Sequence, residues 1–153
     1  MNKIIVGTGQ HIYEVEQPFG TLSSGLSWGN TSHVATDSSG KVYVYQRKDP
    51  PILIFGCEGH LLGSWGDDQL MDAHGIFVSP NDEIFVCDRD AHQVVKYDLQ
   101  GNVLLKLGSR EKPALHKPFN HPADIAVSMN GDIFVADGYA NSCVHHFTSN
   151  GIY

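Results

Sequence analysis

Short runs of β-branched and aromatic residues, separated by turn clusters, cover most of the chain. In its middle part, residues 75–78 and 83–87 form two such runs, and a Ser-Pro-Asn-Asp cluster lies between them. Further runs follow at residues 93–97 and 103–107. Runs of this length and composition predict strands, and the cluster between the first two is of the kind that closes a hairpin. No window shows a helical period long enough to compete, so the pattern predicts an all-β protein.

A segment of about forty residues built on this plan occurs three times along the chain. The strand–turn–strand parts that align with one another are residues 32–47, 74–89 and 123–139. Successive copies are offset by 42 and then 49 residues, as the matching positions Val42, Ile84 and Ile133 show. A period in this range indicates a repeat architecture, in which each unit buries its apolar face against its neighbours. Four short antiparallel strands in each unit predict the blades of a β-propeller.

The predicted blades cover about residues 30–66, 73–108 and 122–153, within a single propeller region over residues 1–153. Propellers typically close with about four to eight blades. Three blades cannot close a ring without leaving open strand edges, and the third copy stops where its last strand should begin. We therefore expect a partial propeller. It is either a fragment of a longer protein, which we favour, or half of a ring that self-associates through its open blade edges.

Composition and charge exclude several classes of protein. The chain has no apolar run near the length of a membrane span, and no secretory signal pattern is visible at its start. A net charge of −7 argues against nucleic acid or an anionic membrane as a partner. The three cysteines, Cys57, Cys87 and Cys143, lack metal-ribbon spacing. We expect them to be reduced and packed in strands, which fits a cytoplasmic location.

Candidate chemistry is expected where the three copies differ from one another. Equivalent positions at the start of the first strands hold Ser32, His74 and Ala123, while Arg47 and Tyr139 come just after second strands. Because these two strands are antiparallel, the start of one and the end of the other lie at the same rim, and the first strand lines the central channel of a propeller. We therefore expect His74, Arg47 and Tyr139 to converge at one end of the channel, as the polar groups of an active site do.

The segments around these positions carry a resemblance to a known family. The matching segments are residues 42–47, 73–76, 91–96 and 134–142. The repeats resemble NHL repeats, and the chain is similar to the N-terminal half of the peptidyl-α-hydroxyglycine α-amidating lyase family and its stand-alone bacterial members. The Asp-Gly-Tyr-x-Asn run at residues 137–141 is the most specific match, because the family keeps its catalytic tyrosine there.

This resemblance implies a fold, a reaction and a set of roles. Family members are six-bladed propellers that split a carbinolamide, the α-hydroxyglycine group of a peptide or small molecule, into an amide and glyoxylate. His74 matches the first of three histidines that hold a zinc ion, which lowers the pKa of the substrate hydroxyl. Tyr139 matches the proposed general base, and Arg47 matches an arginine that orients substrate oxygens. The family also binds calcium, partly through carbonyl groups that match Val34 and Ile76.

The metal site is expected to be incomplete within this chain. The other two zinc histidines of the family would lie beyond Tyr153, and Ser32 and Ala123 occupy the equivalent first-strand positions here. Zinc would therefore need ligands from outside the chain. The alternative is a non-catalytic NHL-repeat propeller that serves as a protein or ligand interaction platform, since one fold hosts many functions.

Two other polar clusters are given structural interpretations. Arg89, which is the repeat equivalent of Arg47, is expected to be a solvated rim residue, with Asp88 and Asp90 in a surface ion-pair cluster. His145 and His146 are expected in a third strand, far from the channel. Adjacent strand residues point to opposite faces, so these two imidazoles should not bind one ion together.

Overall fold

The chain folds into strands and connecting loops throughout the part that the structure describes. The computed structural model describes residues 3–16 and 18–153, and no helix that could cross a membrane occurs among them. Its strands are β1 (Ile4–Thr8), β2 (His11–Val15), β3 (Thr31–Thr36), β4 (Val42–Gln46), β5 (Ile52–Phe55), β6 (Leu61–Trp65), β7 (Ala73–Val78), β8 (Ile84–Asp88), β9 (Gln93–Tyr97), β10 (Val103–Gly108), β11 (Asp124–Val127), β12 (Ile133–Asp137) and β13 (Cys143–Phe147).

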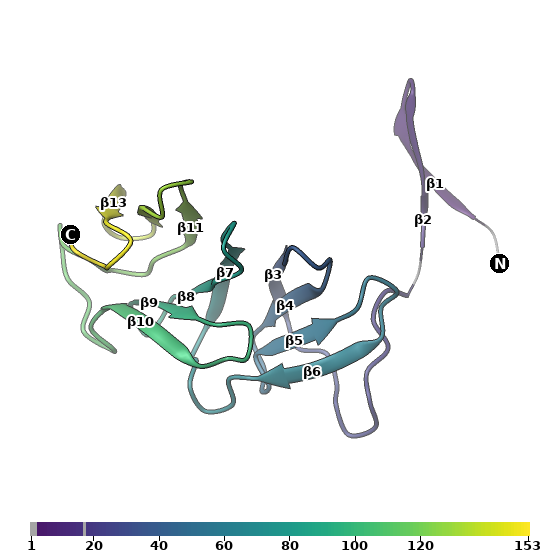
Figure 1. Ribbon diagram of the computed structural model, residues 1–153, viewed down its shortest axis with the longest axis horizontal. Helices are drawn as coiled ribbons and strands as arrows, with labels where there is room; N and C mark the ends of the chain where they lie inside the picture. Colours follow the sequence, from purple (N-terminus) through teal and green to yellow (C-terminus); the bar gives the residue numbers. More distant parts are fainter. Residues whose placement is uncertain (1–2, 17) are drawn as a thin grey trace.

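Three antiparallel sheets follow one another in chain order. The first has the strand order β3-β4-β5-β6, the second β7-β8-β9-β10 and the third β11-β12-β13. In Figure 1 the first strands β3, β7 and β11 lie along one side of an arc, and the outer strands β6 and β10 lie along the other. Strand β7 contacts both β3 and β11, so the first strands of successive sheets are neighbours. The all-β fold with four-stranded propeller blades is thus confirmed. In the described residues the third blade has three strands.

Two hydrophobic cores lie between successive blades, and β8 contributes to both. Ile84 and Val86 pack with residues of the first blade, such as Tyr43 and Tyr45. The alternate residues of β8 face the third blade, where Phe85 packs with Ile133 and Val135 among others. Because both faces of β8 are covered, the strand is apolar along most of its length rather than alternating with polar residues. Each such side chain contributes roughly 1.5–3 kcal/mol when it is fully buried.

The cysteines differ in their surroundings. All three are free, and Cys87 and Cys143 lie in β8 and β13. Cys57 is exposed in the turn between β5 and β6, so the expectation that it packs in a strand is wrong. The turn places its side chain outside both cores. Burial raises the pKa of the Cys87 thiol well above its usual value, which keeps that residue neutral and apolar in character.

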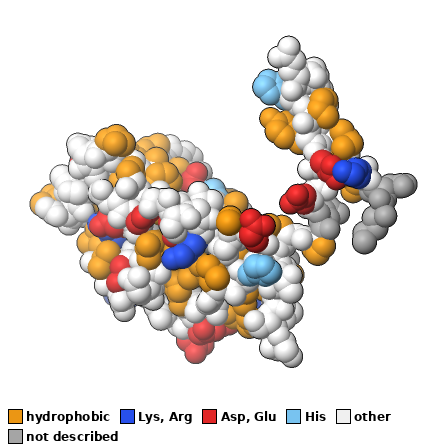
Figure 2. Space-filling model, turned by 45° about the vertical axis from the view of Figure 1, so that its right-hand side comes forward, with side chains coloured by type: hydrophobic (Ala, Val, Ile, Leu, Met, Phe, Trp, Pro, Cys, Tyr) orange, Lys and Arg blue, Asp and Glu red, His pale blue; other side chains and the backbone are white. Residues whose placement is uncertain are grey.

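A two-stranded hairpin at the start of the chain was not anticipated from the repeats. Strands β1 and β2 pair antiparallel from Ile4↔Val15 to Thr8↔His11. The hairpin projects away from the blades (Figure 1), and Figure 2 shows hydrophobic side chains on its surface. Ile5 and Tyr13 are among the exposed apolar residues of this arm. An isolated pair of strands has marginal stability in water, so the blades and not this arm determine the fold.

Gly75→Ala is expected to destabilise the contact between the second and third blades. A Cβ at Gly75 would lie 2.6 Å from the carbonyl oxygen of Ala123 and 3.0 Å from Cα of Asp124. Backbone atoms cannot move aside cheaply, so we expect a loss of about 1–3 kcal/mol in the free energy of unfolding, measured by urea denaturation. Gly63→Ala is the matched control, because nothing lies within 4 Å of a Cβ there. Equal stability of the two variants would contradict close packing of these blades.

Candidate active site

The candidate side chains come from first-strand starts and second-strand ends of successive blades. His74 is the second residue of β7, Arg47 directly follows β4, and Tyr139 lies two residues after β12. The chain leaves β4 and β8 in the same way: the backbone N–H of Arg47 donates to Asn30 O at 2.9 Å, and that of Arg89 donates to Asp72 O at 3.0 Å. This repeated bond places both arginines at the rim where the first strands begin.

His74 and Tyr139 form a hydrogen-bonded pair across the second and third blades. His74 Nδ1 lies 2.7 Å from the carbonyl oxygen of Ala123, and Nε2 lies 2.8 Å from the Tyr139 hydroxyl. A carbonyl oxygen can only accept, so Nδ1 carries a proton, and in the neutral imidazole Nε2 accepts from the tyrosine. The two rings meet edge to face with centroids 5.4 Å apart. The Ala123 carbonyl therefore fixes the imidazole with its Nε2 lone pair facing Tyr139.

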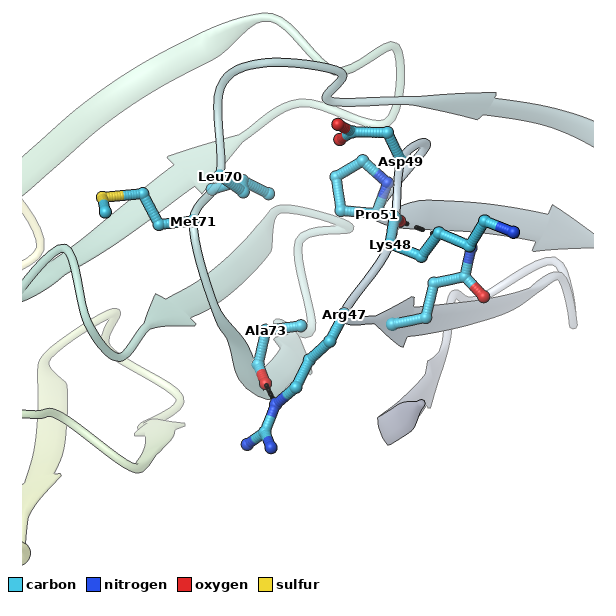
Figure 3. A pocket seen from close by; sticks show the side chains of 8 residues that line it. Arg47, Lys48, Asp49, Pro51, Leu70, Met71 and Ala73 are labelled. Atoms are coloured by element: carbon cyan, nitrogen blue, oxygen red, sulfur yellow. Dashed lines mark hydrogen bonds between the residues drawn. The ribbon is translucent and has the colours of Figure 1, made fainter. Parts of the chain in front are cut away.

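Arg47 lies on the other side of His74. The two residues line one cleft of about 270 Å³ together with Asn30, Thr31 and Ser32. The Nε group of Arg47 donates to Ala73 O at 3.1 Å and lies 2.9 Å from Oδ1 of Asp72. Figure 3 shows the terminal nitrogens of Arg47 pointing away from Ala73, at the edge of a second pocket that also contains Pro51 and Leu70. The guanidinium is thus anchored through Nε and open at its far end.

Arg89 also belongs to this cluster, so the expectation of a solvated rim residue is wrong. Its Nε lies 2.7 Å from Oδ2 of Asp72 and 3.0 Å from Oδ1 of Asp90, and only about 24% of its side chain is exposed. Its guanidinium carbon lies 5.5 Å from the centroid of the Tyr139 ring, a cation–π distance. The hydrogen bond to Asp90 is the main cause that raises the pKa of Arg89, and the same bond lowers the pKa of Asp90.

The side chain of Asp88 holds the loop before β7 in place at this rim. The interpretation of Asp88 as part of a surface cluster is wrong, because its side chain is fully buried. Its carboxylate accepts the backbone N–H groups of Met71 at 3.0 Å and Asp72 at 2.9 Å. Burial raises the pKa of Asp88, while these two bonds act in the opposite direction. The carboxylate therefore fixes the loop that carries Asp72 between the two arginines.

A second polar cluster lies where β12 ends, beside the start of β13. Within the described residues, Asp137, Cys143 and His145 are the group whose ligand atoms lie close enough together to hold a metal ion. Internal bonds already occupy the fully buried carboxylate: Oδ2 of Asp137 lies 3.0 Å from His145 Nε2 and accepts from Asn141 Nδ2 at 2.7 Å. Burial raises the pKa of the Cys143 thiol, whereas a metal ligand is a thiolate. The cluster is therefore explained as a structural hydrogen-bond network.

The adjacent histidines of β13 point to opposite faces, as the alternation of a strand requires. His145 is buried, while the His146 ring stacks on Phe134 with centroids 4.6 Å apart and pairs with Asp132. The two imidazoles therefore have different partners on different sides of the sheet, and they do not face one ion.

His74 has the surroundings expected of one nitrogen ligand of a zinc site. A metal-binding histidine usually donates its second ring N–H to a carbonyl or carboxylate group, and His74 Nδ1 does so with Ala123. Val34 and Ile76 occupy matching positions in the neighbouring strands β3 and β7. Their assignment as calcium ligands stays a prediction. The assignment of His74 as a zinc ligand likewise stays a prediction.

Comparisons with known proteins agree with this architecture. The NHL repeat family matches residues 70–97 and 119–147. A virginiamycin B lyase from Staphylococcus aureus, solved as a catalytically inactive variant with quinupristin, superimposes with a TM-score of 0.63. The match covers 99% of this chain and 47% of that protein at 17% identity, a level that supports the shared propeller fold alone.

Sequence comparison points to a particular group of propellers. Peptidyl-α-hydroxyglycine α-amidating lyase 1 of Drosophila melanogaster is 30% identical over 128 residues, which are 81% of this chain and 24% of the relative. A probable lyase of the same kind from Caenorhabditis elegans is 34% identical, over 65% of this chain and 29% of the relative. Human NHL repeat-containing protein 3 is 34% identical over 72% of this chain and 35% of its own length.

These matches cover only a part of each relative. The chain spans about a quarter of the length of the two curated lyases that it matches. The NHL repeats, the four-stranded blades and the sequence similarity agree with one another. The protein is an NHL-repeat β-propeller homologous to the peptidyl-α-hydroxyglycine α-amidating lyases.

Proposed function

We propose that this chain carries part of a lyase site that cleaves a carbinolamide of the α-hydroxyglycine type into an amide and glyoxylate. The hydrogen-bonded pair of His74 and Tyr139 carries the proposal, because the Ala123 carbonyl holds the imidazole in the tautomer that such a site requires. The similarity to named amidating lyases supports the choice of reaction. A bound zinc ion would supply Lewis-acid chemistry that activates the substrate hydroxyl.

Each of the three side chains has a definite task in this proposal. His74 offers Nε2 as a ligand and keeps its orientation through the bond from Nδ1 to Ala123. The hydroxyl of Tyr139 lies 2.8 Å from that nitrogen. A zinc ion on Nε2 would replace this hydrogen bond, and Tyr139, as the phenolate, could then take a proton from a substrate held between the blades. Arg47, fixed through Nε by Ala73 and Asp72, presents its terminal N–H groups to substrate oxygens.

In this proposal, zinc and calcium both need further ligands from outside the described residues. One imidazole does not hold a catalytic zinc ion tightly, since such sites use three protein ligands. We propose that the other ligands come from further blades, or from a second copy that pairs through the open edge of the third blade. Calcium would bind through the carbonyl groups of Val34 and Ile76, which are suitable hard oxygen ligands.

Residues 1–153 alone are expected to hold zinc substoichiometrically and to release no glyoxylate. The reason is that a metal site gains its affinity from several ligands in a preformed geometry. Zinc content after dialysis and glyoxylate release from an α-hydroxyglycine peptide would be measured for this chain and for the complete protein. The complete protein should bind zinc and release glyoxylate. One tightly held zinc per isolated chain would contradict the expectation, and one per two chains would indicate a self-paired ring.

Failure of the complete protein in the same assay would decide between the two functions considered. A complete, folded protein that binds zinc fully but releases no glyoxylate from several such peptides would contradict the lyase. The interaction platform would then be the better account of these blades.

A further inference from the structure

A second arginine stands at the site, in the position that repeats Arg47. Arg47 and Arg89 each follow the second strand of a blade, 42 residues apart. The third blade has Gly138 at the equivalent place and presents Tyr139 beside it. Arg89 reaches across to the third blade and lies 5.5 Å from the centroid of that tyrosine ring. The blades thus place two cations around the His74–Tyr139 pair.

One carboxylate holds the two arginines together. Oδ1 of Asp72 lies 2.9 Å from Nε of Arg47, and Oδ2 lies 2.7 Å from Nε of Arg89. The N–H of Arg89 Nε is directed at Asp90, so its contact with Oδ2 is an ion pair without a well-aligned hydrogen bond. Oδ2 is in consequence a buried carboxylate oxygen without a hydrogen-bond donor among the described residues. Asp72 is only about 13% exposed, which makes its attraction for both guanidinium groups stronger than in water.

The terminal nitrogens of the two arginines have N–H donors to spare for a ligand. Within the described part of the chain, the hydrogen bonds of Arg47 and Arg89 leave from Nε, to Ala73 O and to Asp90 Oδ1. A guanidinium has five N–H donors, and those on the terminal nitrogens match the two oxygens of a carboxylate. Arg89 is about one quarter exposed and Arg47 about one third, so both can be reached from solvent.

We propose that Arg89 is a specificity-determining residue, which with Arg47 selects substrates that carry a free carboxylate next to the hydroxylated carbon. The inference rests on the proposed function, since an α-hydroxyglycine and the glyoxylate formed from it both have such a carboxylate. Asp72 orients the two guanidinium groups, and Arg89 also covers one face of Tyr139. Substrates whose carboxylate is converted to an amide lose the charge that these arginines recognise.

Arg89→Gln is expected to weaken binding of glyoxylate by the complete protein about tenfold or more, because a charge-assisted hydrogen bond is lost. Binding would be followed by isothermal titration calorimetry with glyoxylate as the probe. Arg89→Lys should recover part of the affinity, since the charge returns without the planar fork. Lys96→Gln is the control, because it removes a positive charge that pairs with Glu83 outside this site. Its affinity should equal that of the unaltered protein.

Steady-state kinetics of Arg89→Gln distinguish carboxylate recognition by Arg89 from the lyase reaction itself. With an α-hydroxyglycine peptide, Arg89→Gln should raise KM more than it lowers kcat, and it should reduce the preference for that peptide over the form with an amidated carboxylate. Unchanged glyoxylate affinity in Arg89→Gln, or no binding by the unaltered protein, would overturn the inference whether or not the protein is a lyase. Arginine-dependent binding without any turnover would instead uphold it and contradict the proposed reaction.

Discussion

Tyr139→Phe is expected to reduce glyoxylate release by the complete protein about a hundredfold or more, as loss of a general base typically does. The fold should not change, because the ring is 59% exposed and the substitution removes only the hydroxyl. That hydroxyl donates to His74 Nε2 at 2.8 Å, so the variant loses the group nearest the proposed metal ligand. Turnover of an α-hydroxyglycine peptide would be measured together with zinc content, which should stay unchanged.

Tyr13→Phe provides a matched control for this substitution. Tyr13 is similarly exposed, at 60%, but lies on the projecting β1–β2 hairpin, away from the blades. Its loss of a hydroxyl should leave turnover unaltered. If Tyr139→Phe releases glyoxylate at a near-normal rate, the tyrosine does not act as a base, and the interaction platform gains as an explanation.

His74→Ala is expected to lower the affinity for zinc, and its loss of turnover should follow from the loss of zinc. Loss of a group that hydrogen-bonds to a metal ligand typically costs about 10- to 100-fold in metal affinity, and loss of the ligand itself should cost more. Zinc content after dialysis should therefore fall to a small fraction of that in the unaltered protein, and turnover should fall with it. Tyr139→Phe differs, since it should lose turnover and keep its zinc.

His146→Ala is the control for the histidine variant. His146 is 55% exposed on the outer strand of the third blade and pairs with Asp132. Its removal should change neither zinc content nor turnover. Normal zinc content in His74→Ala would show that His74 is a structural residue, held by its bond to Ala123, and would contradict the metal assignment.

The blades could be predicted from the repeats because the burial of each strand determines its pattern of apolar residues. Alternate residues of β8 fill the two neighbouring cores, so a strand buried on both faces reads as one apolar run in each copy. The positions of His74 and Arg47 followed from the same alignment, since the start of a first strand and the end of the antiparallel second strand lie at one rim. In the structure, His74 shares a cleft with Arg47 and forms a hydrogen bond with Tyr139. Their chemical roles stay predictions.

The part of the site that sequence did not predict depends on contacts between blades and with loops. The repeat pattern does not reveal the pairing of Arg89, because its partner Asp72 lies in the connection before β7, outside the segment that repeats. Its contact with Tyr139 joins the second blade to the third over 50 positions in the sequence. The only local signal was its equivalence to Arg47. The internal bonds of Asp137 and His145 were missed for a similar reason, because no spacing rule links a strand end to its neighbour strand.

Anomalous diffraction at the zinc edge, on crystals of the complete protein grown with zinc, would show whether His74 is a metal ligand. We expect one strong peak within coordination distance of His74 Nε2, about 2.0–2.1 Å, beside the hydroxyl of Tyr139. The cleft that contains Arg47 should open onto the same peak. A peak at Asp137, Cys143 and His145 with none at His74 would contradict the account, as would an unoccupied His74 in crystals that hold zinc elsewhere.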